Sequence, residues 1–122
     1  MKININNKKK VLMVQGLHEE GQKLLLQRDD IEPITIMSAN EDEILEASKE
    51  VHGITVRTAN ISRKIIENSK NLQVVSRHGV GYDSIDVEAL NDCGIPLAIA
   101  AHSNMISVAE HAMFMLLSLI HI

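Results

Sequence analysis

Aromatic side chains are almost absent from this 122-residue chain, which has no tryptophan, one tyrosine and one phenylalanine. Hydrophobic residues still make up 45% of the composition, enough for one packed domain, so disorder along the whole chain is excluded. The core is therefore expected to consist of Ile, Leu, Val and Met. The lack of aromatics also excludes a surface on which nucleic-acid bases stack, so the lysines at 8–10 fit a solvated arm.

Cysteine occurs once, as Cys93, which excludes an internal disulfide and suits a reducing compartment. Its position just before Gly94, at the end of an expected helix, favours a packing residue over a nucleophile. The sequence shows no secretory signal, and no apolar stretch long enough to span a membrane. The six histidines have no metal-ligand spacing, so no metal is expected. We expect a cytoplasmic protein without nucleic-acid or membrane partners.

Short aliphatic runs alternate with helical patterns along the chain. Strands are predicted at 10–15, 32–37, 52–56, 72–76 and 95–99, and helices at 18–28, after Asn40, at 61–69 and between Asp86 and Gly94. Connections of this length suit right-handed crossovers, and apolar strands without clean alternation suit a parallel sheet covered on both faces. The predicted fold is α/β, a flavodoxin-like, doubly wound, five-stranded parallel sheet.

A final helix differs from the others because apolar residues occupy nearly all of its faces between 107 and 120. Ser107 and Glu110 have the spacing of a capping box, which predicts a start at Ser107. A helix that is apolar all round is buried on all sides, and one sheet alone cannot bury it. We therefore expect it to pack against another domain or a second copy of the chain, most simply as a homodimer.

Two loops at the ends of predicted neighbouring strands carry the candidate binding residues. Gly79, Val80 and Gly81 resemble the start of a dinucleotide fingerprint, but Ser84 replaces the third glycine and the loop follows the fourth strand. The loop is either a structural turn or a close approach of backbone N–H groups to an anion. Arg57 and Arg77 stand at neighbouring strand exits, where they suit an anionic small molecule or surface ion pairs.

Two other doubly wound protein classes are excluded by the residues at the strand exits. A phosphoacceptor receiver needs acidic groups after the first strand, Asp after the third and Lys after the fifth. Residues 15–16, 57–58 and 100–101 are instead QG, RT and AA. A flavodoxin needs a Ser/Thr-rich phosphate loop after the first strand, and QGLH at 15–18 is not one.

The runs VRTA at 56–59, RHGVGYDSID at 77–86 and NMISVAEH at 104–111 resemble the NAD-dependent D-2-hydroxyacid dehydrogenases. The resemblance extends from the first strand to Leu119. It implies that residues 1–104 are the N-terminal portion of a substrate domain and residues 105–122 an interdomain helix. It also implies hydride transfer between NAD(H) and a 2-hydroxy or 2-oxo acid, as in phosphoglycerate dehydrogenases and hydroxypyruvate or glyoxylate reductases.

The resemblance also assigns roles to single residues. It implies that the backbone around Gly79, Val80 and Gly81 receives the substrate carboxylate. Arg57 and Thr58 would hold the distal charged end of the substrate, and Arg77 would be a second anion contact. Asn104 would lie near the reacting carbon, and Val80 and Val108 would border the cofactor cleft.

Two departures from the family pattern limit what the resemblance implies. The Asn-x-Pro signature that family members often carry after the fifth strand is replaced by AAHS at 100–103, which weakens phosphoglycerate as the specific substrate. The family's dinucleotide loop and its catalytic Arg, Glu and His would belong to a nucleotide domain after Ile122, so the chain alone is expected to be inactive. The alternative is a freestanding, non-catalytic domain that binds small carboxylates.

Overall fold

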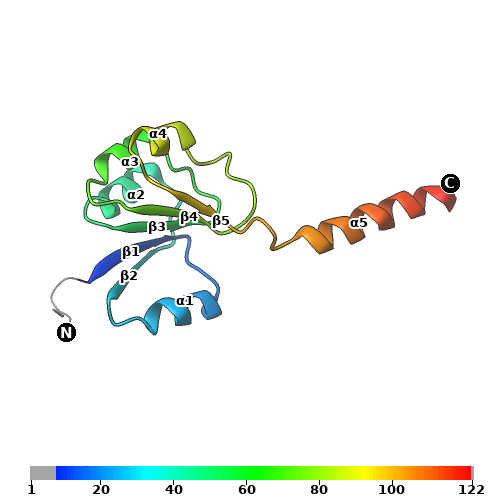
Figure 1. Ribbon diagram of the computed structural model, residues 1–122, viewed down its shortest axis with the longest axis horizontal. Helices are drawn as coiled ribbons and strands as arrows, with labels where there is room; N and C mark the ends of the chain where they lie inside the picture. The colour runs from blue at the N-terminus through cyan, green and yellow to red at the C-terminus, as the bar shows by residue number, and fades with distance from the viewer. Residues whose placement is uncertain (1–7, 122) are drawn as a thin grey trace.

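Five parallel strands form the centre of the computed structural model, which describes residues 8–121 (Figure 1). The strands are β1 (Lys9–Val14), β2 (Ile31–Ile36), β3 (Gly53–Val56), β4 (Val74–Arg77) and β5 (Leu97–Ile99). The helices are α1 (Glu19–Leu26), α2 (Glu41–Ala47), α3 (Arg63–Asn68), α4 (Val87–Asp92), α5 (Met105–Ser118) and the 3₁₀ turn η1 (Leu119–His121). The predicted elements are thus confirmed, and their ends agree to within two residues.

The strand order is β2-β1-β3-β4-β5, and every neighbouring pair is parallel. This is the flavodoxin-like order predicted from the alternation of strands and helices. The chain begins in the middle of the sheet, adds β2 on one side and then continues on the other, so the change of direction lies between β1 and β3. Pro33 is tolerated because β2 is an edge strand.

The core is aliphatic, as the composition predicts, and it lies between the sheet and the helices α2, α3 and α4 (Figure 1). Alternate strand residues point into it, and the helices contribute isoleucines, an alanine and a leucine. Its members from these elements are Leu12, Val14, Ile54, Val56, Val75, Ile44, Ile65, Ile66, Ala89 and Leu90. Neither aromatic residue belongs to it, since Tyr82 and Phe114 are both exposed.

The opposite face of the sheet is covered less completely than expected. Helix α1 has no buried residue and packs beside β2, so it shields only that half of the sheet (Figure 1). Over β4 and β5 the face is open, and Val74 is 38% exposed. The expectation of full cover on both faces is wrong for this chain, because α5 follows β5 without packing back on the sheet.

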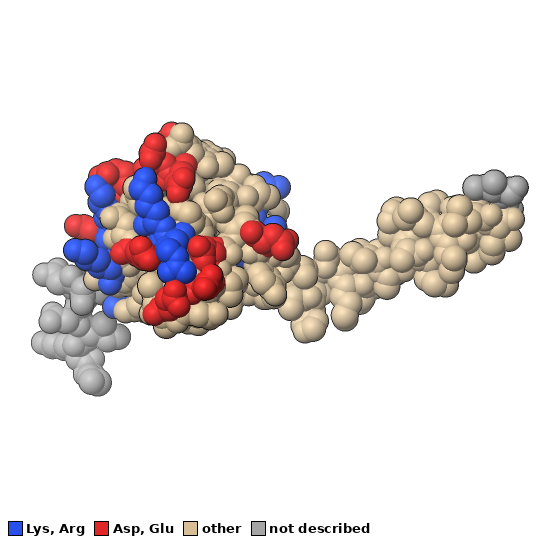
Figure 2. All heavy atoms as spheres, turned by 90° about the horizontal axis from the view of Figure 1, so that it is seen from above, with Lys and Arg blue, Asp and Glu red and all other residues tan. Residues whose placement is uncertain are grey.

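Helix α5 projects away from the domain and has no buried residue (Figure 1). Its large apolar side chains are exposed, from 53% for Leu117 to 70% for Ile106. Glu110 is its one Lys, Arg, Asp or Glu residue, and the face seen in Figure 2 shows no charged side chain, whereas the domain carries both signs. Among the described residues, no helix is long and apolar enough to cross a membrane.

Two local predictions are wrong. Helix α5 begins at Met105, because the Val108 N–H already donates to the Asn104 carbonyl at 2.9 Å, so Ser107 and Glu110 lie inside the helix and form no capping box. Cys93 is not a packing residue, since it caps the C-terminus of α4 with an exposed thiol.

Candidate functional site

The loops that follow β3 and β4 lie side by side at the carboxyl edge of the sheet. They start from a paired position, because Val56 is the register partner of Arg77 and the His78 N–H donates to the Val56 carbonyl at 2.8 Å. They end at a second pairing, an isolated parallel bridge between Ile61 and Ile85. The two loops, residues 57–60 and 78–84, are therefore fixed at both ends, which is the scaffold that a rigid binding site needs.

The glycine at position 79 is demanded by its surroundings. Its φ is +147°, a conformation that L side chains rarely adopt, and a Cβ built there would lie 1.4 Å from Nη1 of Arg77. Its N–H donates to the Arg77 carbonyl at 2.9 Å, and its carbonyl accepts from the Ala100 N–H at 3.0 Å. Gly79 thus supplies shape, and it joins the loop after β5 to the loop after β4.

The next two N–H groups of the glycine loop are free. Among the described residues, the N–H groups of Val80 and Gly81 have no hydrogen-bond partner. Val80 is half-buried and Gly81 is exposed, and neither lies in a regular element. Adjacent unpaired N–H donors at a loop of this kind suit a carboxylate or a phosphate. This arrangement favours the ligand-binding alternative over a bare structural turn.

Arg77 packs its guanidinium over the glycine loop. Its Nη1 donates to the His78 carbonyl at 3.1 Å, whereas its Nε is buried without a hydrogen-bond partner among the described residues. A buried N–H without an acceptor costs about 1–3 kcal/mol. An acceptor that reached Nε, such as an oxygen of a bound anion, would relieve this cost.

Arg57 and Thr58 follow β3, and both are exposed. The main chain here is held by Gln15, the residue after β1, whose Oε1 accepts from the N–H groups of Thr58 at 2.7 Å and Ala59 at 2.8 Å. The sequence interpretation missed Gln15 as a site residue. A signal was available, since a polar residue at the exit of the strand next to β3 is placed to reach the loop after β3.

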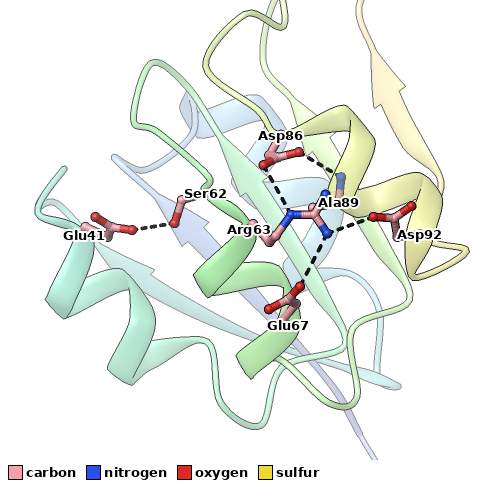
Figure 3. Close-up of polar contacts among 7 residues, drawn as sticks. All are labelled: Glu41, Ser62, Arg63, Glu67, Asp86, Ala89 and Asp92. Atoms are coloured by element: carbon pink, nitrogen blue, oxygen red, sulfur yellow. Dashed lines mark hydrogen bonds and ion pairs between the residues drawn. The ribbon is translucent and has the colours of Figure 1, made fainter.

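The far end of the glycine loop is anchored through α4 and α3. The Asp86 carboxylate accepts from the Ala89 N–H at 2.8 Å and thereby caps α4, the helix predicted between Asp86 and Gly94. Arg63 of α3 lies 4.0 Å from that carboxylate, bonds Asp92 at 2.8 Å and contacts Glu67 at 3.4 Å (Figure 3). The hydrogen bond with Asp92 raises the pKa of Arg63, which stays charged and links the two helices.

Asn104 and Val108 lie apart from the loops described above. Asn104 immediately precedes α5, is exposed, and makes no side-chain capping bond within the described residues. Val108, at 57% exposed, lies on the projecting helix. The loop after β5 is joined to the glycine loop by the hydrogen bond from the Ala100 N–H to the Gly79 carbonyl, which involves neither Asn104 nor Val108. The roles predicted for Asn104 and Val108 therefore stay predictions.

The fold and its loop edge define the class of protein: an α/β domain of the doubly wound type, with Arg57 and Arg77 at the ends of neighbouring strands and two backbone N–H groups that have no partner among the described residues. A model of the family described as "D-isomer specific 2-hydroxyacid dehydrogenase, catalytic domain" matches residues 11–115. The chain belongs to the D-isomer specific 2-hydroxyacid dehydrogenase family.

Two relatives and one solved structure illustrate the similarity. D-3-phosphoglycerate dehydrogenase of Methanocaldococcus jannaschii is 36% identical over 110 residues, which cover 89% of this chain and 21% of the relative. Hydroxypyruvate reductase of Thermotoga maritima is 34% identical over 103 residues, covering 84% of this chain and 33% of the relative. NAD⁺-bound 3-phosphoglycerate dehydrogenase of Entamoeba histolytica superposes with a TM-score of 0.75 at 26% identity, covering 89% of this chain and 38% of that one.

The chain therefore spans a fifth to a third of the length of these two curated relatives. The family implies NAD, but the residues present do not form a binding site for the whole cofactor. No GxGxxG run occurs in the 122 residues, and Gly79 and Gly81 lie in a loop where Ser84 stands at the third glycine position. The glycine run that would hold the pyrophosphate of a dinucleotide is therefore missing from these residues.

Proposed function

We propose that this chain is the substrate-binding portion of an NAD-dependent dehydrogenase for a 2-hydroxy or 2-oxo acid, resembling phosphoglycerate dehydrogenase or hydroxypyruvate and glyoxylate reductases. One observation carries the proposal: the adjacent N–H groups of Val80 and Gly81 are unpaired among the described residues, in a loop that Gly79 and Arg77 shape. The carboxylate of the acid accepts from these two donors. Fixed donors of this kind hold the neighbouring carbon in one position, which is a contribution of orientation.

The remaining roles rest on the resemblance to the family, and for the two arginines also on charge and position. Arg57 and Thr58 bind the far, anionic end of a larger acid, because both are exposed on the neighbouring loop. Arg77 adds positive charge beneath the carboxylate. Asn104 contacts the substrate near its reacting carbon, and Val80 and Val108 contribute apolar surface beside the nicotinamide. Residues 1–104 then form the substrate domain portion and residues 105–122 an interdomain helix.

The chain alone has no dehydrogenase activity under this proposal, since NAD supplies the hydride chemistry and its site requires residues that are not in this sequence. A cytoplasmic location belongs to the same proposal and is supported by the exposed thiol of Cys93, which a reducing compartment keeps free. The apolar surface of α5 is covered by a second copy of the chain when no other domain covers it, so the isolated chain forms homo-oligomers.

The test is a titration of the 122-residue chain with glycolate, followed through the backbone amide resonances. The matched control is glycolaldehyde, which keeps the hydroxyl group and has no carboxylate. Glycolate is expected to shift the amides of Val80 and Gly81 most, and glycolaldehyde is expected to leave them in place. Equal responses to the two compounds, or glycolate shifts confined to other loops, would contradict the proposal.

A second measurement separates the enzyme portion from a freestanding carboxylate-binding domain. NADH oxidation with glyoxylate is assayed with the chain alone, where we expect none. Detectable NAD-dependent turnover would overturn the assignment of the cofactor site to residues outside this sequence. Tight binding of a small acid by the chain alone would instead favour the freestanding domain, because a substrate-binding portion that supplies only one wall of a cleft is expected to bind the acid weakly.

A further inference from the structure

Gln15 adopts a backbone conformation that its residue type does not favour. It follows β1 directly, its φ is +66°, and among the described residues it is the one non-glycine residue with a positive φ. Its N–H donates to the Ile36 carbonyl at 2.8 Å, so the main chain is held in place by the sheet. A left-handed conformation costs an ordinary L-residue about 1–2 kcal/mol, and asparagine or glycine adopts it more easily. The backbone therefore does not explain a glutamine at this position.

The side chain of Gln15 explains it better. Its Oε1 accepts from two consecutive backbone N–H groups, those of Thr58 at 2.7 Å and Ala59 at 2.8 Å. These contacts join residues 43 and 44 positions apart, across the exits of β1 and β3. Two donors on one oxygen fix the main chain just after Arg57, so the direction in which Arg57 leaves the sheet depends on Gln15.

The NH₂ group of the Gln15 side chain makes a hydrogen bond to the Thr58 hydroxyl. Nε2 of Gln15 donates to Oγ1 of Thr58 at 2.9 Å, and the Thr58 hydroxyl donates to Oε1 of Gln15 at 3.1 Å. A hydroxyl group has one proton and two lone pairs. Because Nε2 already donates to the hydroxyl oxygen, the hydroxyl proton can be given to an anion. Oε1 loses little by releasing it, since it keeps two backbone donors.

We propose that Gln15 is a positioning residue of the anion site. It fixes the Thr58–Ala59 main chain, orients Arg57, and holds the Thr58 hydroxyl as a donor to the second anionic group of a larger acid. This inference rests on the proposed function for its ligand, and on the hydrogen-bond geometry of Gln15 for the loop itself. Selectivity for acids with a second anionic group then depends on a residue that need not touch them.

A comparison of glutamine, asparagine and glutamate at position 15 separates the loss of the contacts that fix the loop from the loss of the N–H donor to the Thr58 hydroxyl. Gln15→Asn shortens the amide by one methylene and suits the left-handed backbone, so it breaks the contacts without adding backbone strain. Gln15→Glu keeps the acceptor for both backbone donors and loses the N–H donor. Its carboxylate also holds the Thr58 proton and adds a negative charge where the anion binds.

The first readout is amide hydrogen exchange at Thr58 and Ala59, which needs no ligand. Gln15→Asn is expected to exchange about tenfold faster than wild type at both positions, as the loss of such hydrogen bonds implies. Gln15→Glu is expected to retain protection. Unchanged exchange in Gln15→Asn would overturn the claim that Gln15 fixes the loop.

The second readout compares the affinities of 3-phosphoglycerate and glycerate, which differ in the second anionic group. Both variants are expected to lower the preference for 3-phosphoglycerate about tenfold, Gln15→Asn through loop disorder and Gln15→Glu through charge and the captured proton. An unchanged preference in Gln15→Glu would overturn the donor role. If wild type binds neither acid, the proposed function and the ligand part of this inference both fail, while the exchange data still decide whether Gln15 fixes the loop.

Discussion

Replacing Gly79 by alanine is predicted to destabilise the domain by about 2–4 kcal/mol through two separable effects. The first is the backbone, because φ at +147° lies in a region that is nearly restricted to glycine and costs other residues about 1–3 kcal/mol. The second is Arg77, whose Nη1 would lie 1.4 Å from the new Cβ. The guanidinium can move, but it then gives up its 3.1 Å bond to the His78 carbonyl, a loss of about 0.5–1.5 kcal/mol.

Two other glycines serve as matched controls for these effects. Gly94 has φ at +66°, and a Cβ added there would have no atom within 4 Å, so Gly94→Ala measures the backbone cost alone, about 1–2 kcal/mol. Gly81 has no positive φ, and the nearest neighbour of a Cβ there would be Oδ2 of Asp83 at 3.7 Å, an ordinary contact. Gly81→Ala is therefore expected to change the stability by less than about 1 kcal/mol.

Urea unfolding measures the series directly. With a slope of about 1–3 kcal/mol per molar urea, Gly79→Ala is expected to lower the midpoint by about 1–2 M, more than Gly94→Ala and far more than Gly81→Ala. In an Arg77→Ala background, the cost of Gly79→Ala is expected to fall to the backbone part. A cost equal to that of Gly94→Ala, or one that Arg77→Ala leaves unchanged, would refute the reasoning that Arg77 demands glycine here.

Three further outcomes are expected. Asp86→Ala removes the cap on the Ala89 N–H and is expected to cost about 0.5–2 kcal/mol in urea unfolding, whereas Asp86→Asn keeps an acceptor and is expected to cost less. Burial, and after it the charges of the neighbouring lysines, lower the pKa of His52 in the folded chain. Neutral His52 therefore makes its full contribution to stability above its ordinary pKa of about 6.5, and this contribution is lost as the pH falls through the lower pKa of the folded state. His52→Gln is expected to flatten the stability profile between about pH 7.5 and 5.5, and an unchanged slope would contradict this assignment. Leu116→Glu is expected to abolish self-association in sedimentation with little change in domain stability, whereas Ser118→Glu, which removes no apolar surface, is expected to preserve association.

The order and type of the elements could be predicted because each strand is a short aliphatic run and each helix has a polar start. Asn40 illustrates this, since its side chain accepts from the N–H groups of Asp42 and Glu43 and begins α2 where the sequence indicates. The start of α5 could not be predicted in the same way. Ser107 and Glu110 have capping spacing, but the Asn104 carbonyl closes the first turn earlier, and spacing alone does not show which turn forms first.

Some features of the candidate site could be predicted from local sequence, and others depend on the fold. The motif around Gly79 and the charges of Arg57 and Arg77 are local features, so the sequence places them at neighbouring strand exits. Only the folded structure shows which N–H groups of the Gly79-Val80-Gly81 motif are available to a ligand. The Gly79 N–H donates to the Arg77 carbonyl, and those of Val80 and Gly81 have no partner among the described residues. No contiguous motif marks Gln15, because its partners lie 43 and 44 residues further along the chain, and its one signal is its place at the exit of the strand next to β3.

By itself the sequence determined the α/β class, the strand order, the aliphatic core, the family and an apolar final helix without an obvious partner. These depend on hydrophobic spacing and on contiguous motifs, which act over a few residues. Only the tertiary structure decided that Gln15 holds the Thr58 loop, that Arg77 makes glycine obligatory at position 79, and that α5 leaves the sheet exposed over β4. These depend on where distant segments meet, and that position is set by strand register and side-chain packing across the whole domain.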